Sequence, residues 1–281
     1  MKIAVLGSIN LDIVASGAPL PRAGETVSGA ALAQHPGGKG ANQAYAALRL
    51  GADTALFGRV GSDAFAEQAL DRLRREGADL GQVQVDAVLP TGVALIAVCP
   101  DGENQITVCS GANAAVAVPQ TVEADALICQ LEIPRAVVAE AIAAFGGFTV
   151  VNLAPATPVP DVLIESADLL IVNETEAAFY GESLHRAQGL VALTLGARGA
   201  ELWQGGQRIA QASPPAVTVV DTTGAGDVFV AALTVGLVGR MTPQDALTFA
   251  CAAGALATTR RGAQPSAPTR AEVDALLEDR R

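Results

Sequence analysis

The chain has 281 residues, of which 50% are hydrophobic and only 4% aromatic, and its formal net charge is −11. This length fits one large domain, or a core with a small appendage, and the interior must be built largely from Ala, Val and Leu. A charged fraction of 17% argues against disorder. The negative net charge would repel a phosphate backbone, which argues against nucleic acid as a partner. A small anionic ligand is not excluded, because local backbone dipoles can hold one inside an acidic protein.

The four cysteines, at positions 99, 109, 129 and 251, show no Cys-x-x-Cys spacing, and only two histidines are present to join them in a metal site. We therefore expect reduced, mostly buried thiols in a cytoplasmic protein. The sequence enters a strand at once, without a signal peptide. Its longest apolar run, 228–238, is too short and too interrupted by glycine to span a bilayer.

Short apolar runs alternate with amphipathic helical patterns along most of the chain. The predicted strands are near-continuous apolar runs, as is typical of strands covered on both faces, at 2–7, 54–61, 126–132, 149–155, 167–173 and 190–196. Helices are predicted between them at 41–50 and 64–76, each closed by a glycine, and from Thr242 to about residue 259. This alternation predicts an α/β fold, with a doubly wound, mostly parallel sheet and helices on both faces.

Two segments break the alternation. Residues 11–34 are punctuated by Gly and Pro without helical periodicity, and residues 91–110 form two strands around a Pro-Asp-Gly turn, which is a hairpin signature. We expect these two segments to form a small antiparallel sheet that stands off the core. The core is then made of residues 1–10, 35–90 and 111–281.

Polar residues follow the predicted strands at the edge where ligands bind in open parallel sheets. Asn10 and Asp12 follow the first strand, Glu132 ends the run at 126–132, Asn173 ends the run at 167–173, and Thr194 lies at the end of the last run. The sequence therefore predicts a site at the carboxyl edge of the sheet.

The stretch TVVDTTGAGDVFVAAL, residues 218–233, places two glycines and an acid before an apolar helix. One interpretation is a flexible turn with Asp227 as a helix cap. The other is an anion hole, in which the amides of Ala225, Gly226 and Asp227 converge at the positive end of a helix. Because an acid beside a phosphate site would repel it, Asp227 is better interpreted as a general base for phosphoryl transfer.

HPGGKGANQA, residues 35–44, is not a Walker A loop, because no glycine lies five residues before Gly38 and no Ser or Thr follows Lys39. The glycines allow close backbone approach to a small ligand, and Asn42 offers a donor and an acceptor to sugar hydroxyls. The alternative is a glycine turn that leads into a helix, with Lys39 in solvent.

GSINLD, residues 7–12, lacks the second and third glycines of a dinucleotide fingerprint. Asp12 either accepts hydrogen bonds from two neighbouring hydroxyls or lies in a surface turn. NETE, residues 173–176, is explained by simple capping, with Asn173 as N-cap and Glu176 three residues on. TLGARG, residues 194–199, is by itself a connection from a strand to a turn.

Eight motifs together carry a family resemblance. In chain order they are GSINLD, GETVSG, PGGKGANQA, QLE, NETEA, TLGARG, VDTTGAGDVF and TRRGAQPS. This set resembles the PfkB-type sugar kinases from residue 3 to the C-terminal helix, and DTTGAGD and GGKGAN are its specific parts. The resemblance implies a ribokinase-like core with a β-sheet lid. It also implies ATP-dependent phosphorylation of a small sugar, with conversion of D-ribose to ribose 5-phosphate as the expected reaction.

The resemblance also implies residue roles. Asp227 would be the base, and Gly224, Ala225 and Gly226 would line the anion hole. The sugar would be surrounded by Asn10, Asp12, Gly38, Lys39, Asn42 and Glu132. The nucleotide and its Mg²⁺ would lie along Asn173, Glu176, Thr194, Gly196, Gly199 and Gly226, with Glu176 acting through water. A monovalent cation, K⁺, would lie among Asp221, Thr223, Ala257, Arg260, Gly262 and Ser266, partly on backbone carbonyls. A homodimer through the lid is expected.

Two departures from the family pattern concern the nucleotide side. Cys251 stands where many relatives carry Asn, and a thiol forms much poorer hydrogen bonds than an amide. The crossovers at 117–125 and 177–189 also look shorter than usual. The alternative functions are a kinase for a nucleoside, deoxyribose or sugar acid, and a sugar-binding sensor without catalysis.

Overall fold

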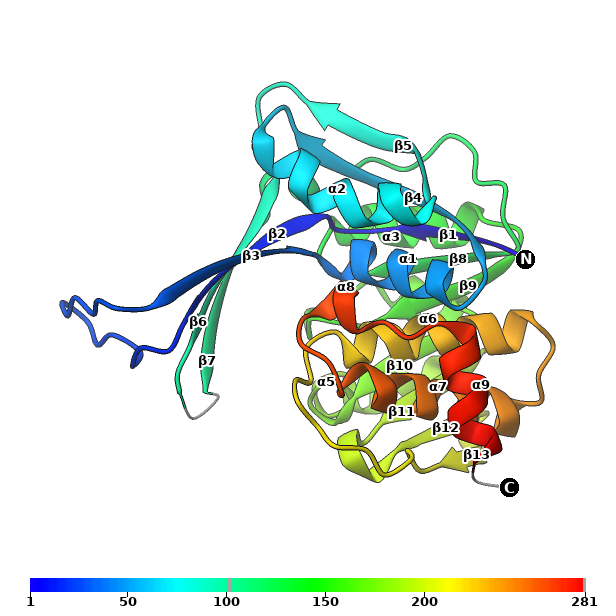
Figure 1. Cartoon of the computed structure of the whole chain (residues 1–281). Helices are drawn as coiled ribbons and strands as arrows, with labels where there is room; N and C mark the ends of the chain where they lie inside the picture. Colours follow the sequence, from blue (N-terminus) through cyan, green and yellow to red (C-terminus); the bar gives the residue numbers. More distant parts are fainter. Residues whose placement is uncertain (101–102, 280–281) are drawn as a thin grey trace.

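The computed structural model describes residues 1–100 and 103–279, which form two β-sheets (Figure 1). The larger sheet has the strand order β13-β12-β11-β10-β9-β8-β1-β4-β5. Its strands are β1 (Lys2–Leu6), β4 (Asp53–Gly61), β5 (Asp79–Asp86), β8 (Ala126–Gln130), β9 (Phe148–Asn152), β10 (Leu169–Asn173), β11 (Leu190–Thr194), β12 (Ala200–Gln204) and β13 (Gln207–Ala212). All neighbours pair in parallel except β11 with β12 and β12 with β13. The predicted mostly parallel sheet is confirmed.

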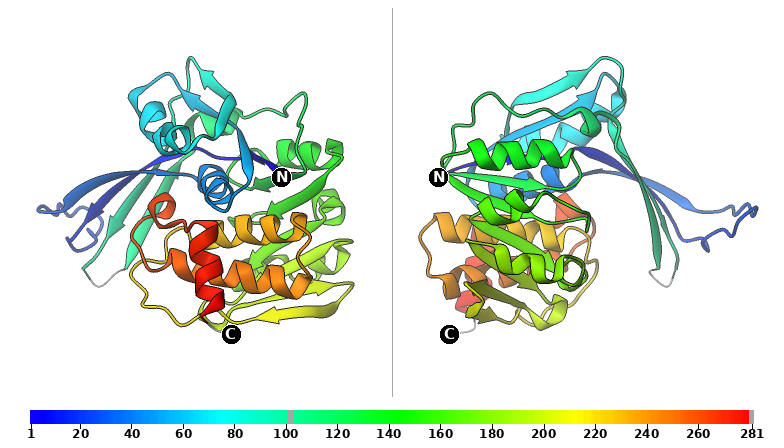
Figure 2. Two further views of the ribbon diagram at one scale, coloured as in Figure 1. Left: turned by 45° about the vertical axis from the view of Figure 1, so that its right-hand side comes forward. Right: turned by 180° about the vertical axis from the view of Figure 1, so that it is seen from behind.

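Helices cover both faces of this sheet (Figures 1 and 2). One face carries α1 (Lys39–Arg49), α2 (Ala64–Glu76), α6 (Ala225–Val238), α7 (Pro243–Ala257) and α9 (Arg270–Glu278). The other carries α3 (Arg135–Ala144), α4 (Asp161–Ser166) and α5 (Glu174–Tyr180). Successive strand residues point to opposite faces, so Ile3 and Val5 of β1 join the first core while Ala4 and Leu6 join the second. The chain therefore has the doubly wound fold that the alternation predicted.

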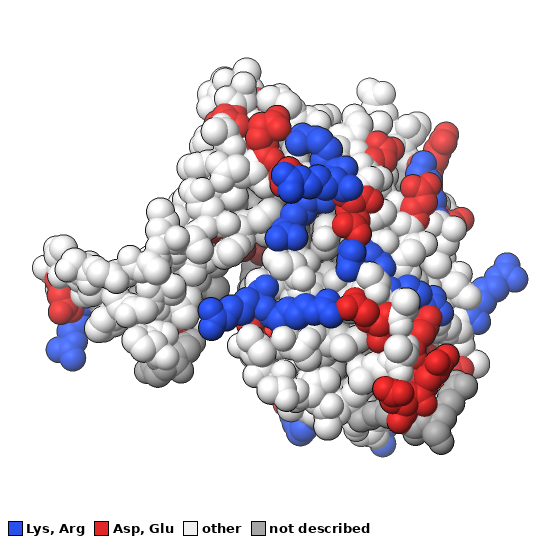
Figure 3. Space-filling view, viewed as in Figure 1, with Lys and Arg blue, Asp and Glu red and all other residues white. Residues whose placement is uncertain are grey.

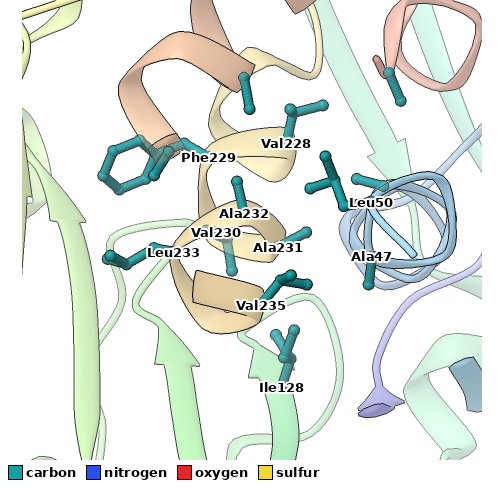
Figure 4. Packing of buried hydrophobic residues seen from close by; sticks show 14 of the residues in the cluster. Ala47, Leu50, Ile128, Val228, Phe229, Val230, Ala231, Ala232, Leu233 and Val235 are labelled. Carbon is teal, nitrogen blue, oxygen red and sulfur yellow. The ribbon is translucent and has the colours of Figure 1, made fainter. Parts of the chain in front are cut away.

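The contact between α1 and α6 lies at the centre of the first core. Figure 4 shows Ala47 and Leu50 of α1 facing α6, with Ile128 of β8 next to Val235. Residues 227–236 of α6 are all buried, which accounts for the apolar run that marks this helix in the sequence. Because alanines line much of the contact, the two helices approach closely, and this brings their N-terminal ends together at the carboxyl edge of the sheet.

Local signals set the helix ends. Asp63 caps α2 by accepting hydrogen bonds from the N–H groups of Phe65 and Ala66, each at 3.1 Å. The helix ends at Gly77, whose φ of 92° is in the left-handed region. Thr242 caps α7 in the same way through the N–H of Asp245. These predicted boundaries agree with the structure to within two residues.

The smaller sheet has the order β3-β2-β6-β7 and projects from the core (Figure 1). Its strands are β2 (Asn10–Ser16), β3 (Ala31–Gly37), β6 (Gly92–Val98) and β7 (Asn104–Cys109). The hairpin of β6 and β7 pairs in antiparallel fashion as the sequence predicted, although Asp101 and Gly102 of its expected turn lie outside the described residues. β2 and β6 pair in parallel, so the expectation of an antiparallel sheet is wrong at this pair, because the two strands come from separate segments and are not joined by a hairpin. The sheet occupies the two segments that break the alternation, except that β2 begins at Asn10 and β3 extends to Gly37. We call this sheet the lid. The residue boundaries between core and lid remain our proposal.

Three strands were not expected from the sequence. β5 has only exposed and half-buried residues, so it lacks the continuous apolar run of the inner strands. β12 and β13 form a hairpin at the other edge, joined at Gly205 and Gly206, which both have positive φ.

The structure shows what the two crossovers that look short in the sequence contain. No helix occurs within 117–125, and residues 177–189 hold the end of α5 and the 3-10 turn η2 (Gly181–Arg186).

Within residues 1–100 and 103–279, no helix combines the length and the apolar character needed to cross a lipid bilayer.

The packing of α1 on β1 predicts the effect of one small substitution. A Cβ at Gly40 would lie 2.5 Å from the carbonyl carbon of Gly7 and 2.6 Å from the nitrogen of Ser8, so Gly40→Ala must displace the backbone. We expect it to lower the free energy of unfolding by about 1–3 kcal/mol in a urea titration. Gly146→Ala is the control, because a Cβ at Gly146 meets nothing within 4 Å. Equal stability of the two variants would contradict this account of the packing.

Candidate active site

Asp227 lies in the first turn of α6 and is 8% exposed. Its two carboxylate oxygens accept hydrogen bonds from α1. The side-chain amide of Asn42 donates to Oδ2 at 3.0 Å, and that of Gln43 donates to Oδ1 at 2.9 Å. Burial raises the pKa of Asp227, while the positive charge of Lys39 and the two amides oppose the rise. A carboxylate with a raised pKa that still faces a cavity is a stronger proton acceptor than an exposed aspartate.

The backbone at the start of α6 offers free N–H groups. The helix begins after Gly224, whose φ of 78° is open to glycine at little cost. The N–H of Ala225 bonds to the carbonyl of Thr222 at 3.2 Å. Among the described residues, the N–H groups of Gly226 and Asp227 have no hydrogen-bond acceptor. Of the three amides expected to converge here, two are therefore free to bind an anion at the positive end of the helix.

Glu132 joins β8 to the start of α1. Its Oε2 accepts hydrogen bonds from the hydroxyl of Ser8 at 2.5 Å and from the backbone N–H of Lys39 at 3.1 Å. The N-cap of α1 is Gly38, which has no side chain to fill this role. Glu132 thus stabilises the N-terminus of α1 from a distant part of the sequence, and this explains why an acid ends a buried strand.

Asn10 and Asp12 lie at the root of the lid on β2. Asn113, in the 3-10 turn η1 (Gly111–Ala115), donates to the side-chain oxygen of Asn10 at 2.8 Å and so fixes its orientation. Asp12 pairs across the lid with His35 and Ala94. Burial, together with the negative charges of Glu132 and Asp227, raises the pKa of Asp12 to about 7. Asp12 is therefore half-buried and turned toward the other acids, and it does not lie in a surface turn.

Lys39 lies among four carboxylates. Burial lowers the pKa of its ammonium group, but this is outweighed by the negative charges of the surrounding acids, so the net pKa is raised. These acids are Asp227, Glu132, Glu176 and Asp12. The lysine is thus charged and faces the site, and the alternative of a solvated Lys39 is not what the structure has.

Asn173 and Glu176 form a capping box at the start of α5. The Asn173 side chain accepts from the N–H of Glu176, and Glu176 accepts from the N–H of Asn173, both at 2.8 Å. Capping is therefore correct, but it is not the whole description. Both residues also line a cavity of about 160 Å³ together with Lys39, Thr194 and Asp227. Burial raises the pKa of Glu176.

A second, larger cavity of about 630 Å³ continues from the first, with Thr194 and Gly226 shared by both walls. Gly196, Gly199 and Cys251 also line it, and the remaining wall is mostly apolar, including Pro214, Val217, Val219, Phe229 and Ala255. The thiol of Cys251 lies 3.7 Å from the carbonyl of Ala212. The two cavities form a continuous path from Asp227 to an apolar pocket large enough for a nucleoside.

The residues expected around a monovalent cation lie in two loops held together by Asp221. Its Oδ2 accepts from the N–H of Gly262 at 2.8 Å, and its Oδ1 accepts from the N–H and hydroxyl of Thr223 at 2.9 and 2.7 Å. Ser266, in α8 (Ala263–Ser266), is buried. Ala257 is fully buried at the end of α7, and its carbonyl oxygen accepts no hydrogen bond from the described residues. Unpaired carbonyl oxygens of this kind fit a cation such as K⁺.

The Arg260 side chain pairs with Glu272 on α9. Its side chain therefore points away from the cation loops, and only its backbone is available there.

The predicted residues are thus brought to one edge of the sheet, with Asp227 between the polar residues around the start of α1 and the two cavities. Six polar residues that contact this group or each other were missed. They are Ser8, Gln43, Asn113, Gln130, Asn152 and Gln264. Four of them lie inside the motifs GSINLD, PGGKGANQA, QLE and TRRGAQPS, and Asn152 interrupts an apolar strand, so these five carried a signal. The contact of Asn113 arises only from the fold.

Comparisons with known proteins point to one family. The profile of the pfkB family of carbohydrate kinases matches residues 1–270. The ribokinase of Bacillus subtilis (strain 168) is 36% identical over 292 residues, which cover 98% of this chain and 99% of the relative. The crystal structure of ribokinase from Thermotoga maritima has a TM-score of 0.91 at 31% identity and covers 99% of both chains. The structure of Arabidopsis thaliana ribokinase complexed with ribose and ATP has a TM-score of 0.89 at 33% identity, and covers 99% of this chain and 98% of its own.

The raised pKa of Asp12 predicts a pH-dependent effect on stability. A pKa of about 7 in the folded state, against 3.8 for an ordinary Asp, means that the folded protein holds this proton more tightly. The resulting stabilisation is full below about pH 4 and is lost as the pH rises through 7. Asp12→Asn should therefore be more stable than the wild type by about 1–3 kcal/mol at pH 8, and the difference should disappear toward pH 4.

Urea unfolding of both proteins from pH 4 to pH 9 measures this difference. Asp53→Asn is the control, because Asp53 is an exposed carboxylate at the opposite edge of the sheet. A constant difference between Asp12→Asn and the wild type at every pH would show that Asp12 does not titrate as described.

Proposed function

The chain belongs to the pfkB family of carbohydrate kinases, and we propose that it transfers the γ-phosphoryl group of ATP to a hydroxyl of D-ribose, giving ribose 5-phosphate. The near full-length similarity to ribokinases supports this substrate. The observation that carries the proposal is the buried carboxylate of Asp227 beside the free N–H groups of Gly226 and Asp227, at the point where the two cavities meet the sugar-side residues.

Asp227 acts as the general base. It removes the proton from the attacking sugar hydroxyl, whose oxygen then forms a bond to the γ-phosphorus as the bond from that phosphorus to the leaving oxygen of ADP breaks. The proton remains on the Asp227 carboxyl until it leaves for solvent. The buried environment that raises the pKa of Asp227 makes it a stronger base than an exposed aspartate.

The N–H groups of Gly226 and Asp227 stabilise the negative charge that develops on the phosphoryl group. They are fixed by the helix before the reaction begins, so no reorganisation is needed as the charge moves. Lys39 lines the same cavity and adds a positive charge next to it. These groups solve the problem of placing an acid beside phosphate, because the local positive potential offsets the repulsion.

The sugar binds between the lid and the N-terminus of α1. Carboxylate and amide oxygens there suit a small polyol, whose hydroxyls donate and accept hydrogen bonds. The proposed sugar-binding residues are Asn10, Asp12, Gly38, Lys39, Asn42 and Glu132. Closure of the lid excludes water, so that the phosphoryl group passes to the sugar and is not hydrolysed.

The nucleotide binds along the larger cavity, with its base in the apolar pocket and its phosphates toward Asp227. Thr194, Gly196 and Gly199 follow its length, and Asn173 and Glu176 lie on the phosphate side. Glu176 would hold Mg²⁺ through water, and the metal would supply positive charge on the phosphate side of the site. Cys251 leaves the base pocket without a side-chain amide.

A monovalent cation, K⁺, binds next to the anion hole. The residues that would hold it are Asp221, Thr223, Ala257, Arg260, Gly262 and Ser266, with Ala257, Arg260 and Gly262 offering backbone carbonyls. Bound there, the ion would link the loop before α6 to the loop after α7 near the start of α6.

The lid also joins two subunits in a homodimer. Cross-strand partners share a face of a sheet, so the face that carries Asp12 at its root also carries Val14, Ile96 and Ile106 farther out. Ile106 is 56% exposed. Figure 3 shows few charged side chains on the visible face of the lid except near its tip. An exposed apolar sheet of this kind is suited to a second copy of the chain.

The protein acts in the cytoplasm, where ATP is available. The four cysteines are unpaired, as expected of a protein from a reducing compartment.

Asp227→Asn is predicted to abolish turnover while sugar and nucleotide binding persist, because the amide has nearly the same shape but cannot accept the proton. ADP release is measured for wild type and variant with a panel of pentoses, hexoses and nucleosides. We expect D-ribose to give the highest kcat/KM and the variant to lose at least about 10²-fold in kcat. Unchanged turnover in the variant removes the mechanism. A higher kcat/KM for a nucleoside or another sugar would show that D-ribose is not the substrate. If no compound gave ADP release, a sugar-binding sensor would be favoured.

Replacing K⁺ by Na⁺ is predicted to lower kcat, because the smaller ion fits a carbonyl-lined site less well. The measurement is the rate of ADP release at constant ionic strength in each salt. Ser266→Ala should weaken the K⁺ response and leave the thermal unfolding midpoint in Na⁺ nearly unchanged. Equal rates in the two salts would contradict the cation selectivity.

A further inference from the structure

The side-chain amides of Asn42 and Gln43 donate hydrogen bonds to the carboxylate of Asp227, and each of them accepts a hydrogen bond from another side-chain amide. Gln43 is bound by Gln130, whose Nε2 donates to the Gln43 Oε1 at 2.6 Å. Asn42 is bound by Gln264, whose Nε2 donates to the Asn42 Oδ1 at 3.4 Å. Each carboxylate oxygen of Asp227 therefore accepts from one end of a chain of two amides, and the other end of each chain is a buried glutamine. We call these the two amide relays.

The relay through Gln43 has a fixed direction. Because its carbonyl oxygen receives the hydrogen bond from Gln130, its NH₂ group must face Asp227. The second N–H of that group donates to Asn152 Oδ1 at 3.1 Å, and Asn152 donates in turn to the carbonyl of Ile171 at 3.3 Å. Gln43 and Gln130 are both fully buried. A flipped Gln43 would lose these bonds and place an oxygen against the carboxylate, so the orientation is enforced.

Each relay ends in an unpaired oxygen. Among the described residues, Oε1 of Gln130 and Oε1 of Gln264 are buried and have no hydrogen-bond partner. Gly7 makes room for the first of these, since a Cβ at that position would lie 2.0 Å from it. A buried acceptor without a partner destabilises a protein, whereas apolar side chains of the same size would pack there without this cost. The amides are therefore best explained by what their N–H groups do.

We propose that Gln43 is a positioning residue for Asp227, which holds Oδ1 so that the free lone pairs of the carboxylate face the sugar hydroxyl. The inference rests on the function proposed above, in which Asp227 is the base. Gln43 does not touch the substrates in this account. It acts only through the carboxylate, and Gln130 acts through Gln43.

The charged groups around Asp227 shift its pKa, and the hydrogen bond from Gln43 acts against those that raise it. Lys39 from α1, Glu132 after β8 and Asp12 from the lid face the carboxylate, and Glu176 lies across the smaller cavity. Three of these four groups are acids, and burial also favours the protonated carboxyl. The hydrogen bond from Gln43 lowers the pKa of Asp227 and thus favours the ionised carboxylate that a base requires.

Gln43→Met tests the proposal, because methionine has a similar shape and no donor. We expect kcat to fall by about 10- to 100-fold with the KM for sugar changed less than about threefold, since only the base is misplaced. The acid limb of the pH profile of kcat/KM should move up by about one pH unit or more, because a hydrogen bond to the charged form is lost. A role in packing alone would lower the unfolding midpoint and leave the acid limb in place.

Thr54→Val is the matched control. Thr54 is also buried and polar, but it lies at the amino end of β4, away from the site, and its hydroxyl bonds to the carbonyl of Ala52. This variant should keep the wild-type pH profile whatever its stability. If Gln43→Met does not fold, Gln130→Met replaces it, and a smaller shift of the acid limb in the same direction is expected.

A folded Gln43→Met, or Gln130→Met in its place, with the wild-type acid limb and kcat would overturn the proposal. This outcome differs from a failure of the proposed function, which is detected separately by full turnover in Asp227→Asn. In the first case Asp227 remains the base and its position comes from Asn42 and the helix alone.

Discussion

The proposed site depends on one constraint, which is that a carboxylate stays able to accept a proton although it is nearly removed from water. Burial favours the neutral carboxyl of Asp227, and the negative charges of Glu132 and Asp12 act in the same direction. Lys39 and the amides of α1 oppose them. The effects that raise the pKa of Asp227 are partly offset by those that lower it, and this balance leaves a carboxylate that can both exist in the ionised form and accept a proton. Moving the start of α1 away from α6 would remove the balancing groups together.

The first turn of α1 contacts several parts of the site because it lies between Glu132, which follows β8, and the start of α6. Its backbone at Lys39 is capped by Glu132, its ammonium group reaches the phosphate-side cavity, and Asn42 and Gln43 hold Asp227. Residues 42 and 43 lie on adjacent faces of the helix, which lets them approach the two oxygens of one carboxylate from different sides. Gly40 allows the helix to lie directly against β1. One helical turn therefore links Glu132, Asp227 and the smaller cavity.

The same arrangement sets function against stability. Four acids around one lysine, together with two buried oxygens without partners among the described residues, are unfavourable in the free protein. The hydroxyl groups of a sugar bound as proposed would donate hydrogen bonds to these acids. The large Ala- and Val-rich core around α6 and α7 supplies the stability that such a site needs, which is consistent with a chain so rich in small apolar residues.

Much of this architecture was determined by the sequence alone. Continuous apolar runs identify β1, β8, β9, β10 and β11, and the capping signals locate α2 and α7, because these depend on local periodicity and backbone chemistry. The motifs GGKGAN and DTTGAGD identified the two helix ends that meet. Asp227 in the second motif lies beside the free N–H group of Gly226, whereas the N–H of Ala225, also expected there, bonds to Thr222. The edge strands β5, β12 and β13 were missed because half-exposed strands lack a continuous apolar run. Only the tertiary structure decided which amide holds which oxygen of Asp227. Contacts between residues 43, 130 and 227 join distant parts of the chain, and no local pattern records a bond that exists only once three separate elements have packed together.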